Sequence, residues 1–390
     1  MFIKRQIQGT LLKYAQGYPA IAILGPRQSG KTTLAKEIFK NHLYISLENI
    51  NQRTFAQDDP EKFLRTNENE YGLILDEIQQ VPELLSYIQT HIDTYDRPGY
   101  FILTGSQNFI LHQSISQTLA GRIAITTLLP LSIEELKNAS LLPNSPEALI
   151  LKGFYPRIYA KDLEPEPWYI HYTTTYIERD VRQIVNVNDL STFERFLQLC
   201  AGRIGQLVNF SSLASDAGIS HNTARSWLSI LQASYIIFLL QPHHKNFNKR
   251  LVKSPKLYFY DTGLACSLLG ISEEKQLKTH YMVGGLFESL VISDIFKNIY
   301  NAGKKPKVYF WRDSHGHEVD CIIERGTELI PIEIKSGETI TKNFFNGLYK
   351  WNNLSDTDPE KNYLIYGGTE NQIRSKGKVL NWKSIANLDI

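Results

Sequence analysis

The nine residues GPRQSGKTT, from Gly25 to Thr33, constrain this chain more than any other segment. They follow the apolar run AIAIL and precede the helix-like run LAKEIFK, so they fit G-x-x-x-x-G-K-[ST] between a strand and a helix. The glycines let successive backbone N–H groups turn toward phosphate oxygens, and the helix N-terminus adds further donors. The segment therefore predicts a phosphate-binding loop rather than a chance glycine turn.

The same pattern gives its residues separate roles. Lys31 is expected to reach the β- and γ-phosphates of a nucleotide and to act in catalysis, and Thr32 is expected to bind Mg²⁺. ATP and Mg²⁺ are accordingly the expected cofactors. The predicted cofactor-binding residues are Gly25, Pro26, Arg27, Gln28, Ser29, Gly30, Lys31, Thr32 and Thr33.

A second acidic element is expected once such a loop is present. The run YGLILDE at 71–77 is an apolar strand that ends in two acids. Asp76 is expected to hold Mg²⁺, and Glu77 to polarise an attacking water, which favours hydrolysis over transfer to a small molecule. The alternative is a strand that simply ends in two solvated acids.

Two further catalytic candidates follow along the chain. Ser106 ends the apolar run GYFILTGS, where it can sense the γ-phosphate or orient water, although a plain strand-to-loop turn explains it equally well. Arg122 precedes the run RIAITTLLP. It is either an arginine finger on a neighbouring subunit's nucleotide, which implies a homo-oligomer, or a cap on the preceding helix.

Apolar strands alternate with helical segments across this third of the chain, which indicates an α/β fold with a parallel sheet and helices on both faces. The strings GPRQSGKTT, ILDEIQ, LTGSQ and SQTLAGRIAITTLLPLSIEEL resemble a prokaryotic group of AAA+ superfamily ATPases that carry a characteristic C-terminal domain. The resemblance extends over nearly the whole chain. We expect an AAA+ P-loop ATPase domain over residues 1–140.

Composition narrows the class of protein. The chain has 42 Lys and Arg against 40 Asp and Glu, which excludes histone-like and polyacidic proteins but not a local basic patch. Three widely separated cysteines form no disulfide or zinc pattern, which indicates a reducing compartment. No secretory signal or membrane-spanning run is visible. We expect a cytoplasmic protein with no membrane partner.

The middle of the chain reads as a connector followed by a DNA-binding module. Prolines cluster between residues 141 and 190, where we expect a linker and helical arm that includes the charged run YIERDVRQI. Residues 209–240 predict two short helices joined at Gly218, the second starting at Ser220 or Asn222 and the first capped by Ser211 or Ser212. Together with a β-hairpin wing they predict a winged helix-turn-helix over residues 191–262.

The wing carries the segregated basic patch that the near-zero net charge conceals. Residues 241–256 hold five basic residues and no acid. Such residues give salt-sensitive contacts to DNA phosphates, whereas a winged helix used for protein contacts is the alternative. The predicted DNA-binding residues are Lys245, Lys249, Arg250, Lys253 and, on the second helix, Arg225.

The last third, residues 263–390, predicts a helix followed by a strand meander. Asp320 lies on one strand, Glu333 and Lys335 share a face of the next, and Glu288 lies on the helix. The three carboxylates are the predicted metal ligands, with Glu333 and Lys335 catalytic, in a site suited to phosphodiester hydrolysis. The arrangement resembles the PD-(D/E)xK restriction-endonuclease-like fold, with Val319 where that motif has proline.

Two functions are compatible with these modules. The first is a Mg²⁺-dependent ATPase that acts on DNA, with a metal-dependent nuclease activity in the C-terminal domain. The second is a nucleotide-switched DNA- or protein-binding assembly whose nuclease-like domain is inactive.

Overall fold

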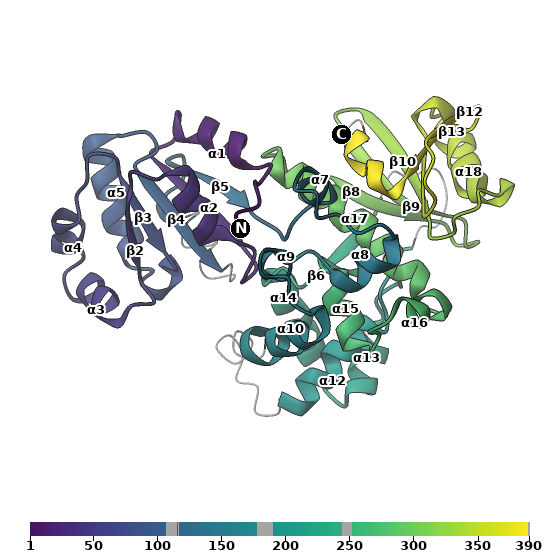
Figure 1. The fold of residues 1–390 in the computed structure, drawn as a ribbon, viewed down its shortest axis with the longest axis horizontal. Helices are drawn as coiled ribbons and strands as arrows, with labels where there is room; N and C mark the ends of the chain where they lie inside the picture. The colour runs from purple at the N-terminus through teal and green to yellow at the C-terminus, as the bar shows by residue number, and fades with distance from the viewer. Residues whose placement is uncertain (107–114, 116, 178–189, 244–251, 389–390) are drawn as a thin grey trace.

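The structure is a computed structural model that describes residues 1–390 except 107–114, 116, 178–189, 244–251 and 389–390. An N-terminal lobe lies at the left of Figure 1, a helical region lies below the centre, and a second sheet lies at the right. Within the described residues, no helix is long and apolar enough to cross a membrane.

The N-terminal lobe contains a five-stranded sheet in the order β2-β3-β4-β1-β5, and every neighbouring pair is parallel. Gly25 is in register with Ser106, and Ser46 with Asp76, so the carboxyl ends of four strands share one edge. The predicted α/β fold with a parallel sheet is therefore confirmed for this lobe. Their bounds are Ala20–Gly25 (β1), Leu43–Ser46 (β2), Leu73–Asp76 (β3), Phe101–Ser106 (β4) and Ile123–Thr127 (β5).

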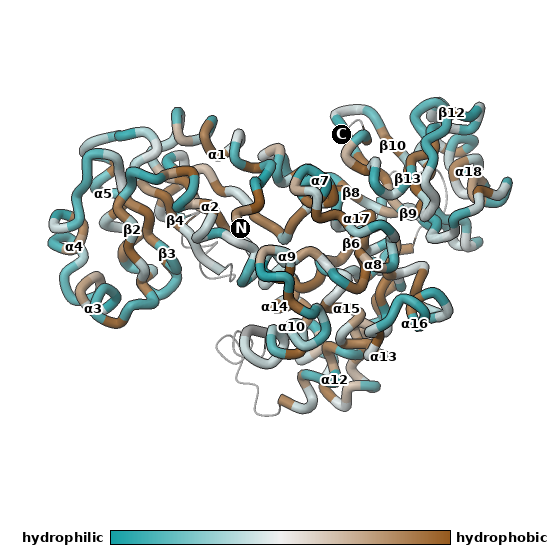
Figure 2. The backbone as a smooth tube through the Cα atoms, in the orientation of Figure 1, coloured by the Kyte–Doolittle hydropathy of each residue, from teal (hydrophilic) through white to brown (hydrophobic). Residues whose placement is uncertain are grey.

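Helices cover both faces of this sheet, as the alternating pattern predicted. Ala22 and Leu24 of β1 pack in the cluster that contains Ile88 of α5, whereas Ile21 packs in the cluster of Leu34 from α2. Figure 2 shows the resulting brown strands between more hydrophilic outer helices. The helices are α1 (Gln8–Ala15), α2 (Lys31–Ile38), α3 (Ile50–Asp58), α4 (Pro60–Thr66) and α5 (Leu84–Tyr95), with a 3₁₀ turn at Ile78–Gln80.

The proline-rich stretch forms short helices. Pro146, Pro156 and Pro165 each occupy the first turn of a helix, where the missing N–H costs nothing and the fixed φ favours the helical start. Three prolines of the predicted linker and helical arm therefore begin helices. These helices and their neighbours are α7 (Ile133–Asn138), α8 (Pro146–Lys152), α9 (Pro156–Lys161), α10 (Pro165–Tyr172) and a π-helix at Thr173–Ile177.

A helix pair joined at Gly218 follows α12 (Leu190–Ala201). Gly218 has a φ of 73°, so it ends α13 (Phe210–Ala217) in the left-handed conformation. Asn209 caps α13, so the expected cap at Ser211 or Ser212 was wrong, whereas Ser220 caps α14 (His221–Ala233) as expected. The winged helix-turn-helix as a whole stays a prediction.

The second sheet has eight strands in the order β12-β13-β11-β10-β9-β8-β6-β7. The expected hairpin forms between β6 and β7, and the expected meander forms from β8 to β10. Strand β6 also pairs in parallel with β8, so the hairpin and the meander share one sheet. The domain boundary at residue 262 stays a prediction. The strands are β6 (Ile237–Pro242), β7 (Lys256–Phe259), β8 (Val308–Arg312), β9 (Glu318–Arg325), β10 (Glu328–Lys335), β11 (Tyr363–Tyr366), β12 (Gln372–Arg374) and β13 (Gly377–Asn381).

One apolar core joins the middle and C-terminal regions to the start of the chain. The cluster contains Ile3, Phe154, Trp227 and Ile295, and it continues to Leu388. The long helix α17 crosses this core and is buried along most of its length. The remaining helices are α15 (Thr262–Leu268), α16 (Glu274–Thr279), α17 (Val283–Asn301) and α18 (Asn346–Ser355), with 3₁₀ turns at Lys342–Phe345, Pro359–Lys361 and Trp382–Asn387.

Candidate nucleotide site

The glycine loop runs from the end of β1 to the start of α2. Gly25 has a φ of 155°, and a Cβ atom there would lie 2.2 Å from the Leu128 carbonyl oxygen, so only glycine fits. Gly30 has a φ of 93° and precedes the first residue of α2. Gln28 is also left-handed, at 63°. These conformations turn the loop around the N-terminus of α2, where free N–H groups favour an anion.

Lys31 lies over this loop and is only 5% exposed. Its ammonium donates to the carbonyl oxygens of Gly25, at 3.1 Å, and Pro26, at 2.8 Å. These two bonds keep the Lys31 ammonium next to the loop, where the motif requires a positive charge to bind a phosphate.

Asp76 ends β3 opposite the start of α2. The Thr32 hydroxyl donates to one carboxylate oxygen at 2.8 Å, and the Thr104 hydroxyl donates to the same oxygen. The Tyr44 hydroxyl donates to the other oxygen at 2.9 Å. Burial and the neighbouring Asp76 carboxylate raise the pKa of Tyr44 to about 12, so the phenol stays a donor. Three hydroxyls thus orient the acid that was predicted to hold Mg²⁺.

Glu77 adopts a left-handed backbone, with a φ of 59°, immediately after this strand. The Gln79 side-chain amide donates to the Glu77 carboxylate and, at 3.1 Å, to the Ser106 hydroxyl. Glu77 and Ser106 were predicted from sequence as catalytic residues, whereas Gln79 was missed. Its only sequence signal is its place two residues after Glu77 in the string DEIQ.

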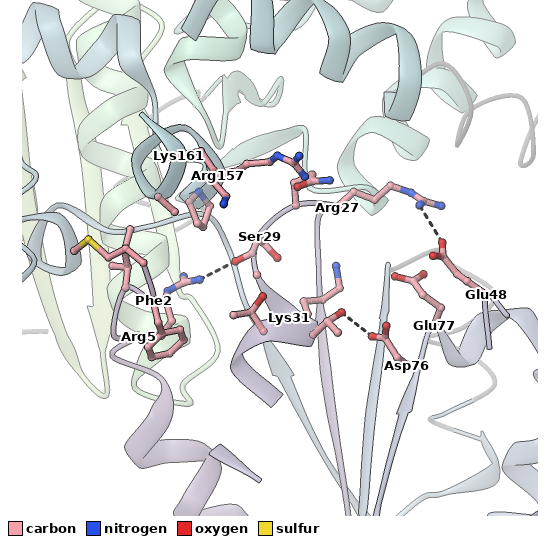
Figure 3. A pocket seen from close by; sticks show the side chains of 18 residues that line it. Phe2, Arg5, Arg27, Ser29, Lys31, Glu48, Asp76, Glu77, Arg157 and Lys161 are labelled. Carbon is pink, nitrogen blue, oxygen red and sulfur yellow. Dashed lines mark hydrogen bonds and ion pairs between the residues drawn. The ribbon is translucent and has the colours of Figure 1, made fainter. Parts of the chain in front are cut away.

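A cavity of about 510 Å³ opens above the loop. Figure 3 shows Lys31 at its centre, Asp76 and Glu77 on one side, and Arg5 on the opposite side. Glu48 lies 3.9 Å from Arg27 at the rim. The remaining walls come from the first three residues of the chain and from α9, which contributes Pro156, Arg157, Ala160 and Lys161.

The residues of this cavity fit a nucleoside triphosphate with Mg²⁺. The volume lies within the range of about 300–1,000 Å³ that small-molecule sites occupy. The cationic Lys31 and the N-terminus of α2 suit phosphates, and the paired hydroxyl and carboxylate of Thr32 and Asp76 are hard oxygen ligands of the kind that Mg²⁺ prefers.

Arg122 does not line the described cavity. Its guanidinium contacts Asp93 through two nitrogens, at 2.5 and 3.0 Å, and donates to the Ala120 carbonyl at 3.1 Å. The last contact matches the capping alternative. A contact to a neighbouring subunit's nucleotide would need the Asp93 pair to open, so the finger role stays a prediction.

Three of the four predicted C-terminal residues meet on adjacent strands. The Lys335 ammonium lies 3.1 Å from Asp320 and 2.6 Å from Glu333. The Ile334 N–H donates to Asp320 at 2.8 Å. One carboxylate oxygen of Glu333 is buried without a hydrogen-bond partner among the described residues. Burial and the nearby Asp320 raise the pKa of Glu333 to about 8.

Glu288, the fourth residue, pairs with Lys256, which the sequence analysis counted among the basic residues of the segment 241–256. Lys256 lies 3.5 Å from Glu288 and also contacts Glu318, and the Tyr258 hydroxyl donates to Glu288 at 2.7 Å. Burial and Asp320 raise the pKa of Glu288 to about 7. Across the described ranges, no group of three or more His, Cys, Asp or Glu is arranged to hold a metal ion. The metal site at Glu288, Asp320 and Glu333 stays a prediction.

The predicted DNA-binding residues divide into two groups. Arg225 lies on α14, 5.1 Å from the centre of the Phe210 ring, and Lys253 is exposed. Lys256, which was counted in the basic segment, is 3% exposed and paired with acids, so including it there was wrong. The other three, Lys245, Lys249 and Arg250, lie outside the described residues.

Comparison with known families supports the reading of the N-terminal lobe. Residues 17–137 match the family described as "AAA domain". This match supports the predicted AAA-type P-loop domain over this part of the chain. Residues 144–275 match domain of unknown function DUF8612, and residues 283–385 match domain of unknown function DUF4143. These two descriptions leave the predicted winged helix and nuclease-like fold as predictions.

Similar chains occur in both bacteria and archaea. An uncharacterized protein of Mycobacterium tuberculosis is 28% identical over 349 residues, which cover 87% of this chain and 75% of that protein. An uncharacterized protein of Methanocaldococcus jannaschii is 24% identical over 349 residues, which cover 81% of this chain and 75% of that protein. Among solved structures, a Walker-type ATPase of Pyrococcus abyssi is 16% identical with a TM-score of 0.45, covering 68% of this chain and 96% of that chain.

Proposed function

We propose that this protein binds ATP with Mg²⁺ and hydrolyses it. The observation that carries the proposal is the contact of Thr32 with Asp76 beside Lys31, in the cavity above the glycine loop. A hydroxyl on the first turn of α2 and an acid at the end of β3 form the pair that a phosphate-bound Mg²⁺ requires.

Each polar group of the cavity then has a task. The loop N–H groups and Lys31 bind and neutralise the phosphates. Thr32 and Asp76 hold Mg²⁺, which when bound offsets charge on the phosphate oxygens. Glu77 orients the attacking water and accepts a proton from it. The Gln79 side-chain amide, which donates to both Glu77 and Ser106, holds Ser106 next to Glu77. Arg122 acts on the nucleotide of a neighbouring copy in a homo-oligomer.

DNA is the proposed macromolecular partner. The helix pair α13–α14 presents Arg225, and the segment before β7 presents Lys253. Contacts of this kind to phosphates bind DNA with little dependence on sequence. We place this action in the cytoplasm, since the three widely separated cysteines form no disulfide pattern.

The C-terminal cluster supports two roles. The juxtaposition of Asp320, Glu333 and Lys335 suits metal-dependent cleavage of DNA. The second candidate, a nucleotide-switched assembly with an inactive nuclease-like domain, is favoured by Lys256, a buried cation already placed against Glu288. A cation there supplies the charge that a metal would otherwise supply.

The test is ATP turnover by the full chain with and without single-stranded, duplex and branched DNA, with the DNA products run on a gel. Stimulated turnover together with Mg²⁺- or Mn²⁺-dependent cutting supports the DNA-processing enzyme. Turnover without cutting supports the switched assembly. If the chain binds ATP but does not turn it over under any of these conditions, the proposed hydrolysis is rejected.

A further inference from the structure

Arg5 precedes α1 and lies beside the glycine loop, at one wall of the cavity. It is 4% exposed, although it lies among the first residues of the chain, beside the exposed Lys4. Figure 3 shows its guanidinium directed at Ser29. An arginine this buried needs partners for its donors, because an uncompensated buried charge destabilises a fold strongly.

The partners of Arg5 are far apart in sequence: one is in the glycine loop, and the others follow β5. One terminal nitrogen donates to the Ser29 carbonyl oxygen at 2.8 Å, and the other donates to the Leu129 carbonyl oxygen at 2.7 Å. Its Nε atom lies 3.0 Å from Glu135, which is 1% exposed. Arg5 thus joins the glycine loop to the segment that follows β5.

The bond to Ser29 fixes the orientation of one peptide group of the loop. A trans peptide is planar, so its C=O and N–H point in opposite directions. Because Arg5 holds the Ser29 carbonyl, the N–H of Gly30 is directed away from Arg5. No cis peptide occurs in the described chain. Gly30 has a φ of 93° and lines the cavity, so this N–H belongs to the set that meets phosphates.

Glu135 cannot leave Arg5 without losing other bonds. Its two carboxylate oxygens accept from the N–H groups of Gln6, at 2.7 Å, and Ser132, at 2.9 Å. The second contact is half of a capping box at the start of α7. The Arg5–Glu135 pair is therefore a buried ion pair held by further hydrogen bonds, and not an exposed surface pair.

The same turn of α7 is docked on α17. The Ile133 N–H donates to Asp294 at 2.8 Å, and Asp294 lies on α17. Gln6 accepts from Ser132 at 3.0 Å and from Asn301, the last residue of α17, at 3.2 Å. A continuous set of buried polar contacts thus leads from Ser29 to the helix that carries Glu288.

We propose that Arg5 is a positioning residue for the nucleotide loop, which keeps the Gly30 N–H directed at the phosphates and ties the loop to α17 through Glu135. The inference rests on the proposed ATP binding. It predicts that nucleotide affinity depends on Arg5, which lines the cavity and whose hydrogen bond to the loop goes to the backbone carbonyl oxygen of Ser29.

The experiment measures the Kd for ATP with Mg²⁺ in the full chain for wild type, Arg5→Met and Arg5→Lys, with Lys4→Met as the matched control. Arg5→Met should raise the Kd by about tenfold or more, since it removes a charge-assisted bond. Arg5→Lys keeps the charge but loses the two-pronged geometry, so its Kd should be intermediate. Lys4→Met should match wild type.

Amide hydrogen exchange separates positioning from general stability. In wild type, ATP should slow exchange in residues 25–33 and in α17; in Arg5→Met below its melting temperature, the effect on α17 should disappear. If Arg5→Met does not fold, the test rests on the Kd of Arg5→Lys for ATP with Mg²⁺. A Kd of Arg5→Lys equal to that of wild type would then overturn the inference. Equal Kd values in all folded variants also overturn it. A wild type that binds no nucleotide instead rejects the proposed function.

Discussion

The hydroxyl of Tyr44 offers a narrow perturbation of the proposed Mg²⁺ site. Tyr44→Phe removes one hydrogen bond to Asp76, of 2.9 Å, and keeps the ring over which the Lys36 ammonium lies at 3.3 Å. Thr32 and Thr104 still hold the other carboxylate oxygen. The change therefore loosens the acid without removing it.

The expected size of the effect follows from the burial of the two partners. Asp76 is 6% exposed, but Tyr44 is half-buried, so water partly replaces the lost donor. A hydrogen bond to a charged group then contributes about 1.5 kcal/mol, the lower end of its usual range. That energy corresponds to about a tenfold change in an equilibrium constant. A loss of about tenfold in metal affinity is also typical when an outer-shell partner is removed.

The assay is the Mg²⁺ dependence of ATP hydrolysis, with the Kd for ATP in EDTA as a second measurement. Tyr44→Phe should raise the half-saturating Mg²⁺ concentration about tenfold and leave the affinity in EDTA unchanged. Because the pKa of Tyr44 is raised to about 12, its ionisation should not appear in the pH profile at neutral or mildly basic pH. Tyr87→Phe, at an exposed position, is the control. An unchanged Mg²⁺ requirement with weaker binding in EDTA would refute the reasoning.

Three further predictions follow from the geometry. Glu77→Gln should keep ATP affinity and lower turnover about a hundredfold or more, measured by isothermal calorimetry and phosphate release; wild-type turnover would remove Glu77 from the mechanism. Lys256→Met leaves Glu288 and Glu318 without their cation and should cost about 3–5 kcal/mol in urea unfolding, whereas adding Glu288→Gln should restore part of it; no loss would contradict the buried pairing. Arg225→Ala and Lys253→Ala should each lower the slope of log affinity for DNA against log salt by about one, and unaltered slopes would rule out these phosphate contacts.

The parts of the fold that were predicted depend on local signals. Each strand of the first sheet is a short apolar run bounded by polar or glycine residues, and the turn at Gly25 and Gly30 requires glycine conformations that the motif states directly. In the parallel sheet that this pattern predicts, Gly25 lies in register with Ser106. The local sequence pattern therefore predicted the glycine loop, the acid at Asp76 and their position at the same edge of the sheet.

The parts that were missed depend on contacts between distant segments. The pairing of β6 with β8 joins Gln241 to Tyr309, and nothing near either residue in sequence encodes it. Lys256 looked like part of a basic surface because its neighbours in sequence are basic, yet the fold buries it against Glu288. Arg5 reaches the loop across 24 residues and Leu129 across 124.

The proline-rich stretch, predicted as a linker and helical arm, shows how one composition fits two local structures. Prolines terminate helices in their interior but favour the first turn, so the same composition fits a connector or a series of helix starts. Pro156 belongs to the second case, and its helix α9 carries Arg157 and Lys161 to the cavity wall. Composition alone did not distinguish the two.

Calorimetric titration of the full chain with a slowly hydrolysed ATP analogue tests the central claim most directly, in the presence and absence of Mg²⁺ and for wild type beside Lys31→Ala. The cavity geometry predicts one nucleotide bound per chain by wild type, tighter with Mg²⁺, and binding weakened at least about a hundredfold in the variant. No heat of binding in the folded wild type, or equal affinity in a folded Lys31→Ala protein, would contradict the assignment of this cavity as a nucleotide site.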